Sequence, residues 1–180
     1  WVGAGLVNVM GLDLSLTSTG VSINGATSTI AVKATGPERL SMISEKVLDL
    51  ICEHLVDVVC VEGYSFASRN SQAHSIGELG GCVRMRLWES GIPFVVVPPT
   101  SRAKFATGRG NASKGEVISS ISAKTGRVFV GSGGDDECDA WVLEEMVLTR
   151  LGVPRFSWTE VQLGALDKVD WTPLESLLNA

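Results

Sequence analysis

Two acidic residues stand at the ends of stretches whose side-chain pattern is typical of strands. Asp13 continues the alternating run that begins at Val7, and Glu62 ends an apolar run that includes Val58. Because side chains two residues apart point to the same face of a strand, each carboxylate should lie on a buried face where its strand ends. The carboxyl ends of strands in an open sheet are a common place for a ligand site. Taken singly, either acid is explained as well by a solvated position at the start of a loop.

A second pair of acids lies on a segment with helical periodicity. Asp136, Asp139 and Leu143 are spaced three and four residues apart, so the two aspartates continue the apolar stripe that must face the sheet. On a solvated helix face they would point the other way. Asp135 and Glu137 are better explained as acids at the start of a helix, where the helix dipole favours anions, and we assign them no chemistry.

Four carboxylates brought together would concentrate negative charge in a partly buried site. The acids concerned are Asp13, Glu62, Asp136 and Asp139. They would repel one another strongly, so the arrangement requires cations or protonation of some of the acids. A site with oxygen ligands only suits Mg²⁺ or Mn²⁺, and two such ions about 4 Å apart can promote phosphodiester hydrolysis. The sequence therefore predicts a hydrolytic site that holds two divalent metal ions.

The surrounding sequence predicts the elements that must hold these acids. It opens with three strands, of which the second and third are joined by the hairpin signal Asn24-Gly25. Amphipathic helices then alternate with two almost wholly apolar strands, as expected for strands covered on both faces. The predicted strands are 7–13, 20–24, 27–32, 57–61 and 92–97, and the predicted helices lie around 40–51, 76–87 and 135–151. This order indicates an α/β fold with a mixed five-stranded sheet flanked by helices.

Four segments, taken in order, resemble the RuvC family of Holliday junction resolvases, which belongs to the RNase H-like and retroviral-integrase-like superfamily. They are Gly11-Leu-Asp13-Leu-Ser-Leu-Thr17-Ser-Thr-Gly20, Val61-Glu62, Gly108-Arg-Gly110-Asn-Ala112-Ser-Lys114 and Asp136-Glu-Cys-Asp139-Ala140. Each is weak alone, but their order and spacing match over about residues 7–151. The resemblance implies an RNase H-like fold and a homodimeric, metal-dependent endonuclease that nicks two opposing strands of a four-way DNA junction.

The resemblance also implies roles for single residues. Asp13, Glu62, Asp136 and Asp139 match the catalytic acids of the family, which hold the two metal ions. Lys114 matches a basic residue that approaches the cleaved DNA backbone.

A third role falls on the loop after the second acid. In the family, an aromatic residue just after that acid contacts bases at the junction centre. Tyr64 and Phe66 are both present here at shifted spacing, and the sequence does not decide which of them serves. Together with Arg69 they are candidates to stack on unpaired bases at a branch point, whereas a core role is the alternative for one of the aromatics.

A basic segment gives independent support for DNA binding. Between positions 102 and 127 the only acid is Glu116, although the chain as a whole carries a net charge of -5. Lys and Arg beside flexible glycines suit contact with phosphates, which positions DNA without reading its sequence. A solvated surface is the alternative. The basic residues are Arg102, Lys104, Arg109, Lys114, Lys124 and Arg127, and we predict DNA contacts for the first four.

Other functions share parts of this pattern. The Asp-x-x-x-Thr-x-x-Gly opening resembles the phosphate loop of actin-like ATPases and sugar kinases, but those proteins need a second related domain. A resolvase-like RNA-processing nuclease, a broader branched-DNA or flap endonuclease and a non-catalytic junction-binding protein remain as alternatives. The complete set of acids argues against the last of these, and the Gly-x-Gly-x-Ala-x-Lys segment favours DNA over RNA.

Composition limits the remaining possibilities. With 180 residues, 44% of them hydrophobic, the chain predicts one nuclease domain over residues 1–151 and a tail over 152–180 whose role the sequence does not reveal. We expect residues 1–6 to be a cloning remnant. The four cysteines lack CxxC spacing, so no zinc site or disulfide framework is expected. Without a predicted membrane span, the expected location is the cytoplasm of a bacterium, as a bacterial or phage-borne enzyme.

Overall fold

The computed structural model describes residues 7–63 and 71–178 and confirms a mixed five-stranded sheet. The strands lie in the order β3-β2-β1-β4-β5. The first three strands of the sequence form an antiparallel meander, whereas β4 and β5 run parallel to β1. The carboxyl ends of β1, β4 and β5 therefore open at the same edge. The strands are β1 (Val9–Asp13), β2 (Thr19–Ile23), β3 (Ala26–Ile30), β4 (Val58–Glu62) and β5 (Phe94–Val97).

The turn between β2 and β3 follows from its sequence. Asn24 and Gly25 both have positive φ angles, of 52° and 80°. A two-residue type I′ turn requires this combination, and Asn followed by Gly adopts it at the lowest cost. The turn sets the register in which Ile23 pairs with Ala26. The local hairpin signal thus fixes how β2 and β3 extend the sheet.

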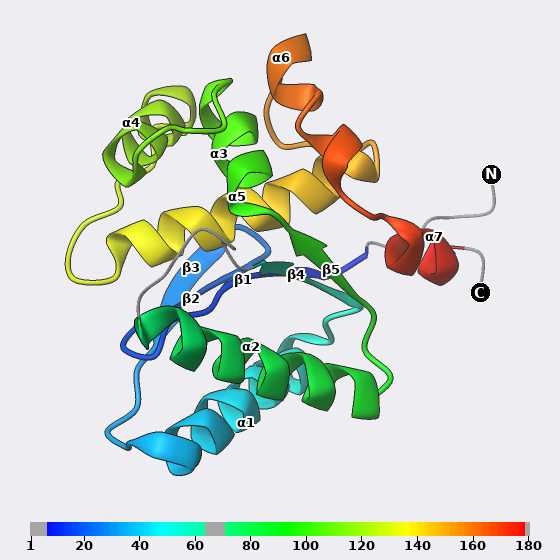
Figure 1. The fold of residues 1–180 in the computed structure, drawn as a ribbon. Coiled ribbons are helices and arrows are strands. Elements are labelled where there is room, and N and C mark those ends of the chain that lie inside the picture. The colour runs from blue at the N-terminus through cyan, green and yellow to red at the C-terminus, as the bar shows by residue number, and fades with distance from the viewer. Residues whose placement is uncertain (1–6, 64–70, 179–180) are drawn as a thin grey trace.

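Helices cover both faces of the sheet (Figure 1). α1 and α2 lie on one face, where they pack on alternate strand residues such as Met10 and Val59. α5 crosses the other face, where α3 and α4 also lie, and packs on the intervening residues such as Val9 and Cys60. These helices are α1 (Gly36–His54), α2 (Ser71–Glu89), α3 (Pro99–Thr107), α4 (Lys114–Thr125) and α5 (Gly134–Arg150). The alternation along β1 and β4 directs Asp13 and Glu62 to the α5 side.

Two glycines allow α5 to lie directly on the sheet. A Cβ at Gly11 would be 1.9 Å from the carbonyl oxygen of Ala140, and a Cβ at Gly20 would be 2.0 Å from the carbonyl oxygen of Asp136. Contacts this short do not occur between real atoms, so a larger residue at either position would push the helix away from β1 and β2. Gly20 also pairs with Asp13 across the β1–β2 ladder. The glycines of the first sequence motif thus bring the acidic end of α5 next to Asp13.

The segment after α5 returns to the core on the α5 side of the sheet. It forms α6 (Glu160–Leu163), a short 3-10 helix η1 (Leu166–Lys168) and α7 (Thr172–Leu178). Trp171 and Leu174 are buried in the same core as α5, and Trp158 stacks against Phe105 of α3 with ring centroids 4.3 Å apart. This segment therefore covers one side of the fold. None of the helices in the described ranges combines the length and apolar character needed to cross a bilayer.

Candidate active site

Asp13 and Glu62 stand at the carboxyl ends of neighbouring parallel strands. Leu12 of β1 lies beside Val61 of β4, and each acid directly follows its member of this pair. Asp13 is 7% exposed, and the Glu62 side chain is 17% exposed. Parallel pairing therefore brings together two carboxylates that are 49 positions apart in the sequence.

α5 supplies two further acids in its first turns. Asp139 is 2% exposed, and the Asp136 side chain is 13% exposed. Their spacing of three residues places both on the side of the helix that packs on the sheet, and the close approach at Gly20 brings this end of α5 next to β2. The structure thus brings the four acids singled out by sequence into one region, above the strand ends.

The protonation of these acids is coupled. Burial raises the pKa of Asp13 well above its usual value, and the negative charges of Glu62 and Asp139 raise it further. Burial also raises the pKa of Asp139 to about 7, although the positive charge of Arg102 opposes the shift. The pKa of Asp136 is raised as well, mainly by burial. Without a bound cation these acids therefore retain a proton to higher pH than exposed carboxylates do.

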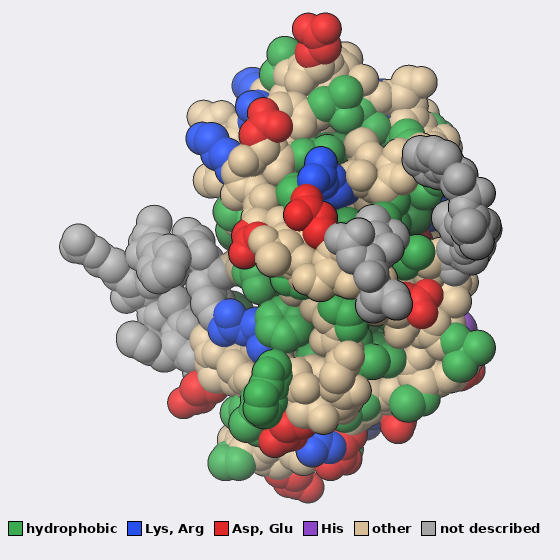
Figure 2. All heavy atoms as spheres, turned by 90° about the vertical axis from the view of Figure 1, so that its right-hand side faces the viewer, with side chains coloured by type: hydrophobic (Ala, Val, Ile, Leu, Met, Phe, Trp, Pro, Cys, Tyr) green, Lys and Arg blue, Asp and Glu red, His purple; other side chains and the backbone are tan. Residues whose placement is uncertain are grey.

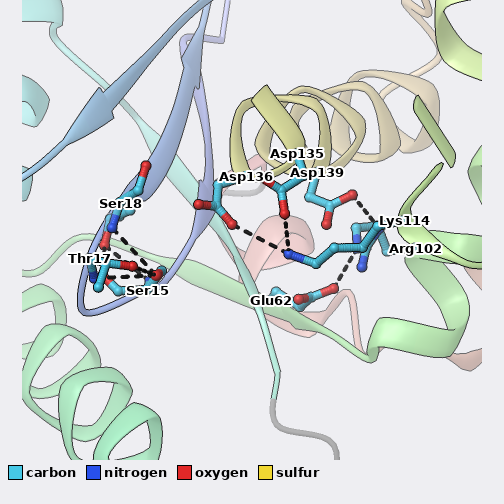
Figure 3. A network of polar contacts seen from close by, with 10 residues as sticks. Ser15, Thr17, Ser18, Glu62, Arg102, Lys114, Asp135, Asp136 and Asp139 are labelled. Atoms are coloured by element: carbon cyan, nitrogen blue, oxygen red, sulfur yellow. Dashed lines mark hydrogen bonds and ion pairs between the residues drawn. The ribbon is translucent and has the colours of Figure 1, made fainter. Parts of the chain in front are cut away.

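Arg102 bridges two of the acids (Figure 3). Its Nε donates a hydrogen bond to Glu62 and its Nη1 donates one to Asp139. The residue is 8% exposed and belongs to the first turns of α3, which follow β5 directly after Pro98. The sequence predicted a DNA contact for Arg102. The structure instead places it inside the acid cluster, because α3 begins immediately beyond the strand end beside Glu62.

Lys114 approaches the cluster from the start of α4 (Figure 3). Its Nζ lies 2.6 Å from Oδ2 of Asp135 and 3.6 Å from Oδ1 of Asp136. Partial burial alone would lower the pKa of Lys114, but the hydrogen bond and the charge of Asp135 raise it instead. Sequence reasoning assigned no role to Asp135 beyond the helix start. The available signal was Lys114 itself, because a basic residue close to a predicted active site is expected to have an acidic partner.

The loop after β1 adds hydroxyl groups beside the acids (Figure 3). The backbone N–H groups of Thr17 and Ser18 donate to the hydroxyl oxygen of Ser15 at 3.4 Å. The hydroxyl of Ser18 in turn donates to Asp136 and opposes the rise in its pKa. Ser18 thus contacts a site acid, a role that the sequence did not assign to it.

The donor set fits a divalent cation. Its ligands are carboxylate oxygens, which hard cations prefer. Oδ2 of Asp139 is buried and has no hydrogen-bond partner. Within residues 7–63 and 71–178, however, no three acidic, histidine or cysteine side chains are spaced as metal ligands. Arg102 and Lys114 occupy positions between the carboxylates, so metal binding requires these cations or the acids to shift.

The remaining predicted DNA contacts have different surroundings. Tyr64, Phe66 and Arg69 lie outside the described residues. Arg109 is exposed and pairs with Glu116.

Three cations of the basic segment are engaged in contacts with other parts of the fold. Lys104 donates to the carbonyl of Gly164 at 3.2 Å, and Lys124 donates to the carbonyl of Ser157 at 2.7 Å. Arg127 donates to the carbonyl of Gly25. The side chains of Lys114 and Arg109 are mainly solvent-exposed, at 58% and 63%, and Lys124 is exposed as well.

Known structures share this fold. A RuvC protein of Thermus thermophilus in complex with a Holliday junction substrate superposes with a TM-score of 0.64 and 21% identity, covering 85% of this chain and 99% of that chain. A yeast mitochondrial Holliday junction resolvase superposes with a TM-score of 0.52 and 11% identity over 77% of this chain and 76% of its own. At these identities the likeness establishes the fold.

Sequence comparisons establish the family. A crossover junction endodeoxyribonuclease RuvC of Sorangium cellulosum is 31% identical over 94 residues, which cover 52% of each protein. A RuvC of Thermus thermophilus is 28% identical over 123 residues, covering 61% of this chain and 74% of the relative. The chain thus spans about half the length of the first relative in this match. The family model for crossover junction endodeoxyribonuclease RuvC matches residues 3–123, about two thirds of the chain. The protein therefore belongs to the RuvC family.

Proposed function

We propose that this protein is a metal-dependent DNA endonuclease that resolves four-way junctions by hydrolysis of phosphodiester bonds. The observation that carries the proposal is that four carboxylates from β1, β4 and α5 interact in one buried region, where Oδ2 of Asp139 has no hydrogen-bond partner. Membership of the RuvC family supports the same reaction. The solved Thermus relative is described as bound to a Holliday junction substrate, which supports branched DNA as the substrate class.

The metal ligands in this proposal are Asp13, Glu62, Asp136 and Asp139. The last two lie beyond residues 3–123, so their assignment depends on the geometry and on the predicted helical spacing. Two Mg²⁺ or Mn²⁺ ions would supply the activation of water and the stabilisation of the leaving oxygen that phosphodiester hydrolysis needs. Burial and neighbouring negative charge raise the pKa values of both Asp13 and Asp139. Bound cations would stabilise the ionised form of these acids, which supports a metal site here.

The protein's own cations would position the DNA backbone. Lys114 stands at the rim of the acid cluster with its side chain 58% exposed, so its ammonium group can turn from Asp135 towards a phosphate oxygen. Arg109 lies in the same loop region and is likewise exposed. Contacts of this kind bind the backbone whatever the base sequence. Direct recognition of the junction centre would fall to Tyr64, Phe66 or Arg69.

We also propose that the active form is a homodimer, because symmetric cleavage of two opposing strands needs two active sites. The outer face of α2 is the candidate contact. Met85 and Trp88 are 53% and 77% exposed there, and a Cβ added to Gly81 would meet no atom within 4 Å. Figure 2 shows hydrophobic side chains gathered over the α1–α2 layer. Light scattering should give a dimer mass for the natural protein and a monomer mass for Trp88→Glu; an unchanged mass in the variant would place the contact elsewhere.

Cleavage of defined DNA substrates tests the proposed function. The purified protein would be incubated with a labelled four-way junction, a 5′ flap and a linear duplex of equal length, each with Mg²⁺, Mn²⁺ or EDTA. Paired symmetric nicks in the junction alone, lost in EDTA, are the expected result. Cleavage of the flap as well would indicate a broader branched-DNA endonuclease.

Two further results would contradict the proposal. Cleavage of a structured RNA but of no DNA would indicate a resolvase-like RNA-processing nuclease. Tight junction binding without cleavage under any metal condition would indicate a junction-binding protein. The variant Asp139→Asn serves as the control in each arm, since any cleavage that persists in it comes from a contaminating nuclease or from a different site.

A further inference from the structure

Arg102 contacts the acids that the proposed function reserves for metal ions. One guanidinium group bridges Glu62 at the end of β4 and Asp139 on α5. Its side chain is 9% exposed, so bulk water screens the pairs poorly. A divalent cation shared by the same two carboxylates would compete with this contact, because the guanidinium already holds one oxygen of each acid and its positive charge repels a second cation between them.

The position of Arg102 is built into the fold. α3 starts directly after β5, with Pro98 as its N-cap, and its residues Ala103 and Phe105 are buried against the core. The backbone that carries Arg102 is therefore fixed, whereas its long side chain retains rotamers that could leave the acids. A fixed backbone with a movable charged group is what an exchangeable counter-ion requires.

The charges do not balance in this arrangement. One guanidinium faces both Glu62 and Asp139, and within the described residues the ion pairs around the cluster leave out Asp13, which is 7% exposed. Oδ2 of Asp139 also remains without a hydrogen-bond partner. Arg102 within the cluster and Lys114 at its rim thus satisfy the four carboxylates only in part, and divalent ions would neutralise them more fully.

We propose that Arg102 is an internal counter-ion that competes with divalent metal for Glu62 and Asp139. It holds the two carboxylates together in the metal-free protein and releases them when the cation binds. The proposal rests on the proposed metal-dependent function and adds a positioning residue that sets the affinity of the site. It predicts that loss of the guanidinium strengthens metal binding, whereas a residue that only supports the ligands would weaken binding when removed.

The test measures metal affinity without DNA. Mn²⁺ binding to the natural protein, Arg102→Gln, Arg102→Lys and Arg109→Gln would be followed by electron paramagnetic resonance of free Mn²⁺. Arg109 is the matched control, because it also pairs with one carboxylate in the same segment but is 63% exposed and lies outside the acid cluster. Melting temperatures in EDTA and in Mn²⁺ would be recorded for each variant, to show that each is folded.

Arg102→Gln should bind Mn²⁺ at least about tenfold more tightly than the natural protein, since one nearby opposite charge shifts carboxylate affinities for cations by this order. It should also melt at a lower temperature in EDTA and gain more from Mn²⁺. Arg102→Lys, which keeps the charge but cannot form the two-pronged contact, should lie between. Arg109→Gln should match the natural protein.

The outcomes separate this inference from the proposed function. Equal or weaker Mn²⁺ binding by Arg102→Gln, with binding by the natural protein intact, overturns the competition and leaves the metal site standing. Binding by Arg102→Gln but not by the natural protein supports competition in its strongest form. If neither protein binds Mn²⁺, both the metal-dependent function and this inference are wrong. If Arg102→Gln does not fold in EDTA, Arg102→Lys is measured in its place. An affinity of Arg102→Lys for Mn²⁺ equal to that of the natural protein would then overturn the proposal.

Discussion

The two halves of α5 carry buried acids in contrasting surroundings. In the C-terminal half, Glu145 is fully buried and accepts hydrogen bonds from the backbone and side chain of Arg155 and from the indole of Trp158. Its neighbour Glu144, 1% exposed, accepts from Ser22 and from the backbone of Gly25. Each of these carboxylates anchors another part of the chain to the helix.

The acids in the N-terminal half of the same helix are compensated only in part. Asp139 is buried to nearly the same degree, at 2% exposed, yet one of its oxygens has no partner. Its pKa is raised by burial, while Asp13 and Glu62 add negative charge nearby. Burial is thus common to both halves, and the difference lies in hydrogen bonding. A buried acid whose partners are complete stabilises the fold, whereas one left incomplete is available for a ligand.

The sharpest test of this contrast removes one charge from the N-terminal half. Asp139→Asn should lower the rate of junction cleavage by on the order of 10³ or more, because loss of one member of a catalytic set is typically this costly. Junction binding should persist in a gel-shift assay, since the basic residues are untouched. Cleavage at the natural rate by this variant would remove Asp139 from the active site.

The opposite result is expected in the C-terminal half. Glu145→Ala removes the acceptor of the Arg155 backbone and side chain and of the Trp158 indole, and leaves Arg155 paired with Glu144 alone. It should reduce the free energy of unfolding by about 3–5 kcal/mol, as measured by urea denaturation. Glu175→Ala, which breaks a surface pair with Arg150, is the control and should cost less than about 1 kcal/mol. Similar losses in the two variants would mean that the buried network contributes no more than a surface ion pair.

The contact between α5 and the sheet should be sensitive to a single methyl group. Gly20→Ala would place a Cβ against the backbone of Asp136, so we expect a loss of about 1–3 kcal/mol in stability together with slower cleavage. Gly115→Ala in α4 meets no atom within 4 Å and should be neutral or stabilising by up to roughly 1 kcal/mol. If Gly20→Ala is as stable as Gly115→Ala, the close packing does not position the acids.

The smallest expected effect concerns pH. The pKa of Asp139 is raised to about 7 in the folded protein, so between about pH 4 and pH 7 the folded state binds a proton that the unfolded state releases. In EDTA the contribution of Asp139 to stability should therefore fall as pH rises through this window and level off above it.

The measurement compares Asp139→Asn with the natural protein by urea denaturation across that range. As pH rises through this range, the free energy of unfolding of the variant should increase by about 1–2 kcal/mol relative to that of the natural protein. This is less than an isolated pKa shift would give, because Asp13 titrates together with Asp139. A stability difference that is constant with pH would show that Asp139 is ionised throughout.

Much of the fold follows from local pattern. The alternation along β1 and β4 predicts which face carries Asp13 and Glu62, and the Asn24-Gly25 turn predicts the hairpin. Helical spacing predicts that Asp136 and Asp139 face the sheet. These features depend on residues close together in the sequence, where the periods of strands and helices apply.

The segment after α5 was harder to interpret because its contacts are distant. Arg155 and Trp158 have no periodic pattern around them, yet they complete the hydrogen bonds of Glu145. Two adjacent acids inside an otherwise apolar helix stretch were the available signal, since buried carboxylates require partners. The sequence could show that Glu144 and Glu145 needed partners but not which residues would serve.

The sequence by itself determined the sheet, the hairpin and the placing of four acids at element ends, because each depends on short-range geometry. Only the tertiary structure decided which cations meet those acids. Arg102 lies 40 and 37 positions from Glu62 and Asp139, and Lys114 lies 21 positions from Asp135. Which basic residues pair with the acids depends on how α3, α4 and α5 pack against the sheet, because ion pairing acts through space rather than along the chain.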